Sequence, residues 1–326
     1  MQGINTVSLF DGISCGRVAF DRAKIPLNRY AAYEIDPDAI KVSQKNWSDI
    51  ERYGDVTTAD FTQYRGFDIL IGGSPCQGFS FAGKQLNFDD PRSKLFFEFA
   101  RAVKEIQPKY ILFENTPMRK EYVGVIDRYL GFESQLLNSK LVSAQDRKRL
   151  YWVGERHTDG TYSKINIPLP EDKGITLEDI VFPDVLLSKD IALNVLNAIG
   201  KDKHIEQIES EYDDITFKAV ELSNIYGGFG EKRPRVHLDK SVTIRTAKGG
   251  GHIPSFVLAD YADGLTLDNF KERIRKAHPV ECERLQTLPD GYTEGVSPTA
   301  RYRCVGNGWT VDMIAWILHT IFSVKI

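Results

Sequence analysis

The first half of the chain alternates short apolar runs with amphipathic stretches. The apolar runs predict buried strands at residues 7–10, 30–33, 67–71, 110–113 and 150–153. Apolar residues at helical spacing separate several of these runs, and the clearest stripe is Leu95, Phe96, Phe99, Val103 and Ile106. Repeated strand–helix units predict an α/β fold with a doubly wound, mostly parallel sheet. Ligands of such sheets bind beyond the carboxyl ends of the strands, so the polar residues there are candidates for function.

The pattern changes after about residue 157, where the apolar signals become short and Gly-rich turns interrupt them. Residues 311–322 are again strongly apolar with helical spacing, and this helix is expected to pack on the first domain. We therefore predict a larger domain that combines residues 1–156 and 300–326. Residues 157–299 are predicted to form a smaller mixed domain with a hinge.

The composition is that expected of a soluble globular protein, with 42% hydrophobic and 27% charged residues in 326. An apolar run of about 18 residues, as a transmembrane helix needs, is absent from the sequence, and the N-terminus lacks the basic segment of a signal peptide. The four cysteines are widely separated, so neither a disulfide framework nor a metal site is expected. These features favour the cytoplasm or another reducing compartment inside a cell.

The net charge of −3 argues mildly against nucleic-acid binding, but the charge is unevenly distributed. Residues 231–252 contain six cations and two acidic residues, which leaves a local charge of +4. Such a segment suits contacts with phosphate groups. The alternative is an exposed basic hairpin with no partner.

The turn from Phe10 to Gly16 directly follows the first predicted strand, and its small residues allow a ligand to approach the backbone. Glu34 ends the second strand, where a carboxylate can accept hydrogen bonds from ribose hydroxyl groups. Asp55 follows the next candidate strand and can contact an adenine amino group. Gly-rich turns are common by themselves, but the three features together favour a nucleoside-cofactor site over a plain tight turn.

Cys76 lies in a loop rich in Gly and Pro, at the carboxyl end of the strand that ends at Ile71. This position favours an exposed thiol over a buried one. A thiol with its ordinary pKa is only a few per cent thiolate at neutral pH, and a nearby cation or a helix N-terminus raises that fraction. The sequence therefore favours a nucleophile, and the alternative is a loop cysteine with no role.

Two further polar groups lie beside predicted strands. Glu114 ends the strand at 110–113 and is expected to point toward the same cleft as Cys76, where a carboxylic acid can hydrogen-bond a ring nitrogen. Residues 145–149 precede the last strand, and an arginine there can hold a base carbonyl oxygen while its neighbours meet phosphate. The alternatives are a strand-end cap for the glutamate and a solvated face for the charged run.

The order of these groups resembles the cytosine-C5 DNA methyltransferase family over about residues 4–156 and 277–322. The segments similar to family motifs are Pro75-Cys76-Gln77, Glu114-Asn115, Gln145 with Arg147 and Arg149, Glu281 to Gln286, and Gly306-Asn307. Residues 10–13 and 73–76 are most similar to the animal de novo branch, and the compact length is similar to bacterial and phage enzymes. The chain departs from the family pattern at Ser74, Thr116 and Gly308, which leaves the catalytic groups in place.

The resemblance implies transfer of a methyl group from S-adenosylmethionine to C5 of a flipped-out cytosine, within a short specific sequence of double-stranded DNA. Cys76 would add to C6, Glu114 would stabilise the adduct at N3, and Arg147 or Arg149 would hold O2. Asn115 is implied as a further active-site residue. The product of the cofactor would be S-adenosylhomocysteine, and bacterial members of this kind serve restriction–modification.

The resemblance also implies binding residues. The cofactor residues it implies are Phe10, Asp11, Gly12, Ile13, Cys15, Glu34, Ile35, Asp55, Val56, Pro75, Leu95, Asn307, Gly308 and Trp309. The unmatched middle would recognise the target, and the expected DNA contacts are Ser80, Lys232, Arg233, Arg235, Arg245 and Lys248.

Three other functions are weighed against this one. The tRNA-modifying branch of the family carries a Cys-Phe-Thr marker that this sequence lacks. A nucleotide-binding oxidoreductase explains the turn and Glu34, but not Cys76 and Glu114 in this order. A catalytically dead DNA-binding module is disfavoured because both of those residues are present.

Overall fold

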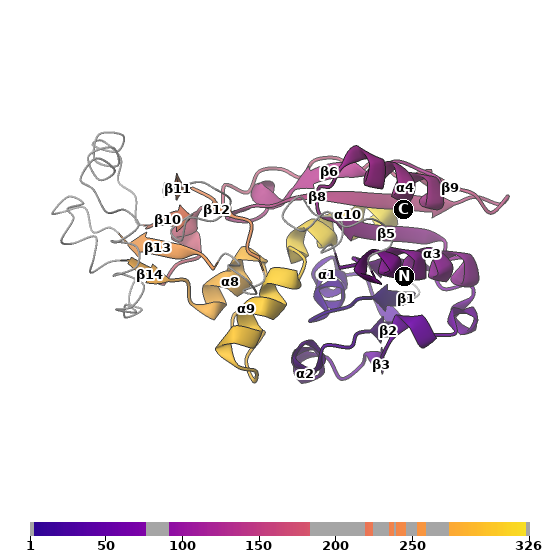
Figure 1. Cartoon of the computed structure of the whole chain (residues 1–326), viewed down its shortest axis with the longest axis horizontal. Coiled ribbons are helices and arrows are strands. Elements are labelled where there is room, and N and C mark those ends of the chain that lie inside the picture. Colours follow the sequence, from indigo (N-terminus) through magenta and orange to yellow (C-terminus); the bar gives the residue numbers. More distant parts are fainter. Residues whose placement is uncertain are drawn as a thin grey trace. The chain divides into compact units, whose positions relative to one another are not determined.

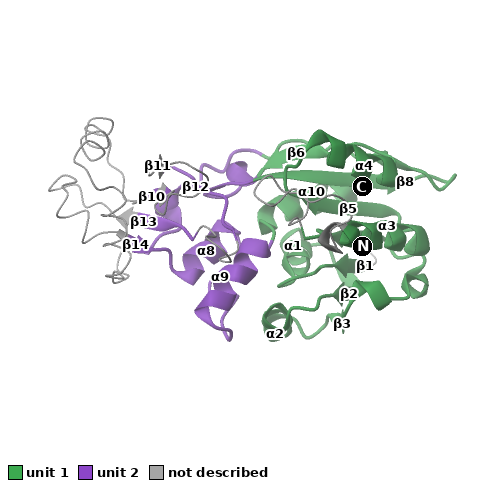
Figure 2. Ribbon diagram, in the orientation of Figure 1, with its two compact units in different colours: residues 1–138, 148–170, 309–326 green, residues 139–147, 171–308 purple. Residues whose placement is uncertain are grey.

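The computed structural model describes residues 3–75, 91–182, 219–223, 235–237, 239–245, 253–258 and 274–323. The chain forms two compact units (Figure 2). Unit 1 consists of residues 1–138, 148–170 and 309–326, and unit 2 consists of residues 139–147 and 171–308. The chain therefore passes between the units several times, and each unit is built from segments distant in sequence.

The described part of unit 1 contains one eight-stranded sheet with the order β3-β2-β1-β4-β5-β8-β6, and β9 pairs with β8 (Figure 1). The strands are β1 (Ile4–Leu9), β2 (Leu27–Tyr33), β3 (Glu51–Tyr53), β4 (Ile69–Gly72), β5 (Tyr110–Asn115), β6 (Gln135–Asn138), β8 (Lys148–Arg156) and β9 (Tyr162–Lys164). Strands β1 to β5 pair in parallel, whereas β8 runs antiparallel to its neighbours β5, β6 and β9. This arrangement confirms the predicted doubly wound, mostly parallel sheet.

Helices connect the parallel strands, as the amphipathic stretches predict. They are α1 (Cys15–Arg22), α2 (Pro37–Asn46), α3 (Pro91–Ile106) and α4 (Lys120–Leu130), with the short 3-10 turns η1 (Val56–Thr58) and η2 (Phe61–Tyr64), and α10 (Val311–Ser323) ends the unit. Helix α2 begins at Pro37, because the Asp36 side chain accepts a hydrogen bond from the Asp38 amide at 3.0 Å and proline suits the first helical position.

Strand β5 shows how the helices cover both faces of the sheet. Ile111 and Phe113 are fully buried in a hydrophobic cluster that includes residues of α3 and α4. Tyr110, which points to the other face, packs its ring against Phe322 of α10 at a centroid distance of 5.4 Å. Helix α10 also packs against α1, and both helices belong to unit 1.

Unit 2 has short strands and its own core. Its described strands form a four-stranded antiparallel sheet, β11 (Arg235–His237), β10 (Ala219–Ser223), β13 (Ser255–Leu258) and β14 (Ile274–Lys276), and a parallel pair, β7 (Gln145–Asp146) with β12 (Ser241–Val242). The helices are α8 (Pro279–Leu285) and α9 (Pro298–Asn307), with the 3-10 turns η4 (Ser139–Leu141) and η5 (Leu177–Asp179). Their apolar side chains meet in a separate cluster that includes Ile244, Phe256 and Leu285.

The motif at residues 281–286 builds the interior of unit 2. Glu281 and Arg275 form an ion pair whose side chains are 0% and 1% exposed. The Glu281 carboxylate also accepts a hydrogen bond from the Phe182 amide at 2.7 Å. Gln286 donates to the carbonyl oxygens of Val305 and Gly308 at 3.0 Å each. These residues therefore stabilise the unit, because buried charges and amides need such partners.

Candidate active site

Strands β1, β2, β4 and β5 of unit 1 have their carboxyl ends at the same edge of the sheet, and predicted site residues lie at or directly after these ends. Leu9 of β1 pairs with Tyr33 of β2 and with Gly72 of β4, and Gly72 pairs with Phe113 of β5. The residues that follow these positions are Phe10, Glu34, Gly73 and Glu114. Parallel pairing in register therefore brings the candidate cofactor residues and the candidate catalytic glutamate to one edge, where α/β sheets bind their ligands.

The loop after β1 has an unusual backbone. Phe10, Gly12 and Ser14 all have left-handed conformations, with φ of 58°, 56° and 62°. For residues other than glycine this conformation costs about 1–2 kcal/mol, and it persists where the surrounding structure holds it. Its position at the edge of the sheet marks this loop as a candidate ligand site.

Asp11 supplies the interactions that hold this loop. Its carboxylate accepts hydrogen bonds from the hydroxyl groups of Ser8 at 2.6 Å, Tyr30 at 2.7 Å and Ser14. Burial raises the pKa of the Asp11 carboxyl above its ordinary value, while the hydroxyl donors oppose that shift. The Asp11 side chain thus faces the protein interior, and its main chain is also held there, because its amide donates to the Tyr33 carbonyl oxygen at 3.0 Å and its carbonyl oxygen accepts from the Ser14 amide at 2.9 Å.

Glu34 joins two loops of the candidate cofactor site. One carboxylate oxygen accepts a hydrogen bond from the Gly12 amide at 2.8 Å, and the other accepts from the amides of Ile35 and Asp36 at 2.8 Å each. The neighbouring Ile35 side chain is 70% exposed, although it is apolar. Glu34 and Ile35 therefore present a carboxylate and an apolar surface side by side.

The other candidate cofactor residues of unit 1 differ in burial. Ile13, Cys15 and Val56 are buried, so their side chains belong to the core and only their main chain can face a ligand. Phe10 and Leu95 are partly exposed and pack against one hydrophobic cluster. The remaining two, Asp55 and Pro75, are exposed.

Asp55 caps η1 at the end of the short strand β3. Its carboxylate accepts a hydrogen bond from the Thr57 amide at 2.9 Å, and this bond lowers the pKa of Asp55 below its ordinary value. Asp55 is therefore an exposed carboxylate whose orientation is restrained by the Thr57 amide.

The loop that leads to Cys76 is anchored by Asn115. The Asn115 amide donates to the carbonyl oxygen and to the hydroxyl oxygen of Ser74 at 3.3 Å each, and both residues are buried. The Asn115 side-chain oxygen accepts from the Thr116 amide at 2.8 Å. Cys76 and Ser80, two of the predicted site residues, lie outside the described residues.

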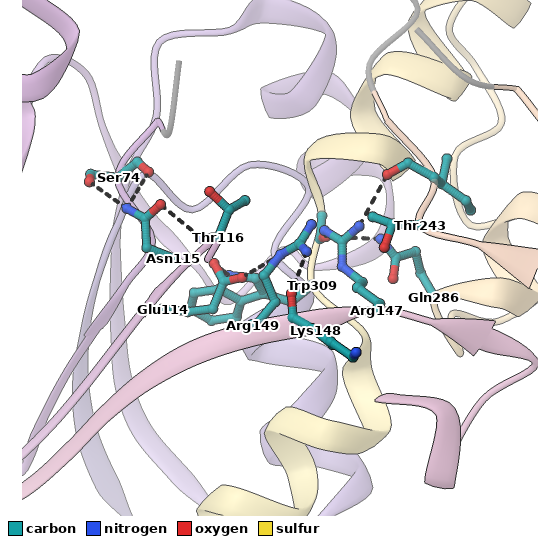
Figure 3. A network of polar contacts seen from close by, with 12 residues as sticks. Ser74, Glu114, Asn115, Thr116, Arg147, Lys148, Arg149, Thr243, Gln286 and Trp309 are labelled. Atoms are coloured by element: carbon teal, nitrogen blue, oxygen red, sulfur yellow. Dashed lines mark hydrogen bonds and ion pairs between the residues drawn. The ribbon is translucent and has the colours of Figure 1, made fainter. Parts of the chain in front are cut away.

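Glu114 is held by two donors at its strand end (Figure 3). The guanidinium of Arg149 lies 3.0 Å from one carboxylate oxygen, and the side chains of Glu114 and Arg149 are each 10% exposed. The indole N–H of Trp309 donates to the other carboxylate oxygen at 3.0 Å. Three predicted site residues, Glu114, Arg149 and Trp309, are therefore in contact. The sequence predicts Trp309 as a cofactor contact and not as a partner of Glu114.

Arg147 has different surroundings, within unit 2. Its buried guanidinium donates to the carbonyl oxygens of Ile244 at 3.2 Å and Gly308 at 2.9 Å. The nearby Gln145 donates to the Leu285 carbonyl oxygen at 2.9 Å and accepts from the Ile244 amide at 3.0 Å. Arg147 thus contacts main-chain carbonyls, whereas Arg149 contacts a carboxylate.

The basic segment is only partly described. Arg245 is exposed, and Arg235 begins β11. Lys240 belongs to the same charged run, but its ammonium group donates to the carbonyl oxygens of Ser143 and Ile175 inside unit 2. Three predicted DNA contacts, Lys232, Arg233 and Lys248, lie outside the described residues. Asn307, a predicted cofactor residue, is exposed at the end of α9.

Sequence reasoning missed two residues that shape this site. The sequence marks Ser74 only as a departure from the family motif, and Gly73 only as part of the loop that contains Cys76. A side chain at Gly73 would begin 2.9 Å from the Glu114 carboxylate oxygen. The adjacent Gly72 and Gly73 were a visible signal of close backbone approach.

Within the described ranges, no group of three or more His, Cys, Asp or Glu side chains is arranged to hold a metal ion. The helices of this part of the chain are also too short or too polar to cross a membrane.

A doubly wound α/β sheet with carboxylates and a left-handed loop at the carboxyl ends of its strands is typical of the class of α/β enzymes that bind a nucleoside cofactor. Within this class, the family model described as C-5 cytosine-specific DNA methylase matches residues 4–323. The chain therefore belongs to the C-5 cytosine-specific DNA methylase family and is a DNA (cytosine-5-)-methyltransferase. This confirms the family that the motif order indicates.

Individual relatives support the same family. The type II methyltransferase M1.ScrFI of Lactococcus lactis subsp. cremoris is 30% identical, over 98% of this chain and 78% of that protein. The type II methyltransferase M.HhaI of Haemophilus parahaemolyticus is 27% identical, over 99% of this chain and 95% of that protein. Among solved structures, Entamoeba histolytica EhMeth has a TM-score of 0.71 with 17% identity and full coverage of both chains, which shows a shared fold.

Proposed function

We propose that this chain uses S-adenosylmethionine to methylate C5 of a cytosine in a short specific sequence of double-stranded DNA, through a covalent bond between Cys76 and C6. The observation that carries the proposal is the position of Glu114. This buried carboxylate is held by Arg149 and Trp309, and it lies level with Gly73, three residues before Cys76. A base stacked inside a duplex cannot reach such a site, so the target cytosine must be flipped out.

The loops after β1 and β2 have the features that S-adenosylmethionine needs. Gly12 leaves open space, because a Cβ added there would meet nothing within 4 Å. Glu34 is placed to accept ribose hydroxyl groups, and the exposed Ile35 side chain offers an apolar surface to the adenine ring. When it is bound, S-adenosylmethionine supplies an electrophilic methyl group. Phe10, Leu95, Asp55 and Pro75 would complete the contacts from the same edge.

The chain supplies a nucleophile and a hydrogen-bonding acid. C5 of cytosine is a poor nucleophile, and addition of the Cys76 thiolate to C6 moves electron density to C5. Glu114 stabilises that adduct through a hydrogen bond at N3. After C5 has taken the methyl group, loss of its proton and breakage of the sulfur–C6 bond restore the aromatic ring. S-adenosylhomocysteine is the other product.

The sequence leaves open whether Arg147 or Arg149 binds the O2 atom of the cytosine, and we favour Arg149. Arg149 already contacts the carboxylate that binds the neighbouring N3. Arg147 is occupied by the carbonyl oxygens of Ile244 and Gly308 within unit 2, which suits a structural role. In this proposal Arg147 holds the connection at Gly308, directly before Trp309.

Residues 157–299 are proposed to recognise the target sequence, and the basic run there to contact phosphate groups. The exposed Arg245 supports this role among the described residues. Flipping a base costs a few kcal/mol, which contacts to the extruded base and to the flanking phosphates must offset. Since DNA is the proposed substrate, the site of action is inside a cell.

Covalent trapping tests the mechanism. The purified chain is incubated with S-adenosylmethionine and a pool of duplexes that contain 5-fluorocytosine, whose fluorine blocks the final proton loss. A stable protein–DNA adduct is expected for the wild-type chain, and none for Cys76→Ala or without S-adenosylmethionine. An adduct that persists in Cys76→Ala would exclude this nucleophile, and trapping on an RNA pool alone would change the substrate.

The cofactor is tested separately by thermal unfolding. We expect S-adenosylhomocysteine to raise the melting temperature of both the wild-type chain and Cys76→Ala, because Cys76 is not a proposed cofactor contact. Stabilisation by NAD alone would contradict the proposed cofactor.

A further inference from the structure

The contacts of Trp309 differ from those expected of a simple cofactor residue. Its indole N–H is directed at the Glu114 carboxylate, 195 positions away in the sequence, with a donor–acceptor distance of 3.0 Å. The other carboxylate oxygen of Glu114 meets Arg149. A carboxylate held at both oxygens has little rotational freedom, and charge-assisted hydrogen bonds of this kind are stronger than neutral ones.

Gly73 provides the space for this contact. A Cβ at position 73 would lie 2.9 Å from the Glu114 carboxylate oxygen and 3.0 Å from the Trp309 indole nitrogen. Those are the two atoms joined by the hydrogen bond. The backbone at position 73 does not have a left-handed conformation, so the glycine is needed for space and not for backbone freedom.

The same indole ring reaches the first turn of α1. A Cβ built at Gly16 would lie 3.6 Å from a carbon of the Trp309 ring. Trp309 is therefore packed between the helix that follows the candidate cofactor loop and the carboxylate that serves the base. It is only partly buried.

We propose that Trp309 is a positioning residue for Glu114, and that Gly73 is required because it leaves room for the Trp309–Glu114 hydrogen bond. The proposal rests on the proposed function, in which Glu114 binds the cytosine ring. Trp309 acts through Glu114: it fixes the carboxylate at the angle from which it meets N3 of the base. Loss of this bond therefore slows the steps on cytosine more than it weakens cofactor binding.

The test is steady-state methylation by the full chain, with kcat and the two KM values measured separately for Trp309→Phe and Gly73→Ala. Both variants are expected to lower kcat by about ten- to a hundredfold, because a hydrogen bond to a charged group is lost. The KM for S-adenosylmethionine is expected to change by less than about threefold. The rate of adduct formation with 5-fluorocytosine duplexes should fall in parallel with kcat.

Two matched variants serve as controls. Trp316→Phe removes a different indole N–H. Trp316 lies on α10, and its indole N–H donates to the Pro168 carbonyl oxygen at 2.7 Å. Gly124→Ala adds a Cβ in α4 where nothing lies within 4 Å. Both are expected to keep wild-type kcat.

Three outcomes decide the proposal. Wild-type kcat in Trp309→Phe would overturn it. A raised KM for S-adenosylmethionine with kcat restored at saturation would overturn it too, and would make Trp309 a cofactor contact. If Trp309→Phe does not fold, Gly73→Ala becomes the decisive variant, since wild-type kcat there contradicts the need for space. Failure of the proposed function is distinct, because the wild-type chain itself would then form no adduct.

Discussion

The side-chain amide of Asn115 donates to both the carbonyl oxygen and the hydroxyl oxygen of Ser74, at 3.3 Å each. This contact ties the last residue of β5 to the loop after β4. Asn115 directly follows Glu114, and Ser74 lies two residues before Cys76. One side chain thus fixes the start of the loop that contains the proposed nucleophile relative to the strand that carries the proposed acid.

We expect Asn115→Leu to slow methyl transfer by about tenfold, because two hydrogen bonds that hold the Cys76 loop are lost while side-chain volume is kept. Single-turnover methylation checks this result. Asn46→Leu is the matched control, since Asn46 donates its amide to the Val42 carbonyl oxygen in α2 at 2.8 Å. Equal rates in the Asn115 variant and the wild-type chain would show that the anchor is unnecessary.

Glu34→Gln is expected to weaken S-adenosylhomocysteine binding by about tenfold or more. In the wild-type chain the Glu34 carboxylate accepts hydrogen bonds from the backbone amides of Gly12 and Ile35. The amide group of the variant would turn an N–H toward one of these donors, so a hydrogen bond that connects the two loops is lost. Isothermal titration calorimetry measures the change. Glu51 of β3 forms an exposed ion pair with Arg29 of β2, and Glu51→Gln should bind S-adenosylhomocysteine as tightly as the wild-type chain. An unchanged dissociation constant in Glu34→Gln would remove Glu34 from the cofactor site.

Glu281→Ala is expected to lower the free energy of unfolding by about 3–5 kcal/mol, because it leaves the buried Arg275 guanidinium without its carboxylate partner. Urea denaturation gives this value. The free energy of unfolding of the double variant Arg275→Met with Glu281→Leu should be much closer to that of the wild-type chain, since both charges of this pair are removed. A loss below about 1 kcal/mol in Glu281→Ala would mean that the pair is hydrated in solution.

The pKa of Asp11 predicts a pH dependence of stability. Burial raises this pKa above its ordinary value of 3.8, so the folded chain holds the proton more tightly than the unfolded chain. The stabilisation by the protonated form is complete below about pH 3.8 and is lost as the pH rises through the folded pKa. Relative to Asp11→Asn, the wild-type chain should therefore lose unfolding free energy as the pH rises from about 4 toward neutrality. Parallel urea-denaturation results for the two chains across this range would contradict the raised pKa.

Much of unit 1 could be predicted from the sequence, because apolar periodicity reports burial. It predicts the strands seen as β1, β2, β4, β5 and β8, and the helix α10. The periodicity carries no strand direction, so the antiparallel pairing of β8 with β5 could not be read from it. In unit 2 the described strands are two to five residues long, too short for a clear period.

The candidate site was predictable in part, because polar residues at the ends of predicted strands are visible in the sequence. Glu34 and Glu114 are predictable because each follows or ends a strand, whereas Asn115 is implied only by the family resemblance. The contact of Trp309 with Glu114 joins residues far apart in sequence, and no local pattern encodes it. Arg275 was missed because a buried arginine gives no apolar signal, and its partner lies on the next helix.

The proposed function requires that this chain methylate cytosine in DNA and that Cys76 be essential for the reaction. Expression in a bacterial host that lacks cytosine methylation, followed by bisulfite sequencing of the host DNA, tests both requirements, with Cys76→Ala as the control. We expect protected cytosines at one short sequence motif with the wild-type chain, and none with Cys76→Ala. A folded chain that leaves every cytosine unprotected, or protection that survives Cys76→Ala, would refute the proposed function.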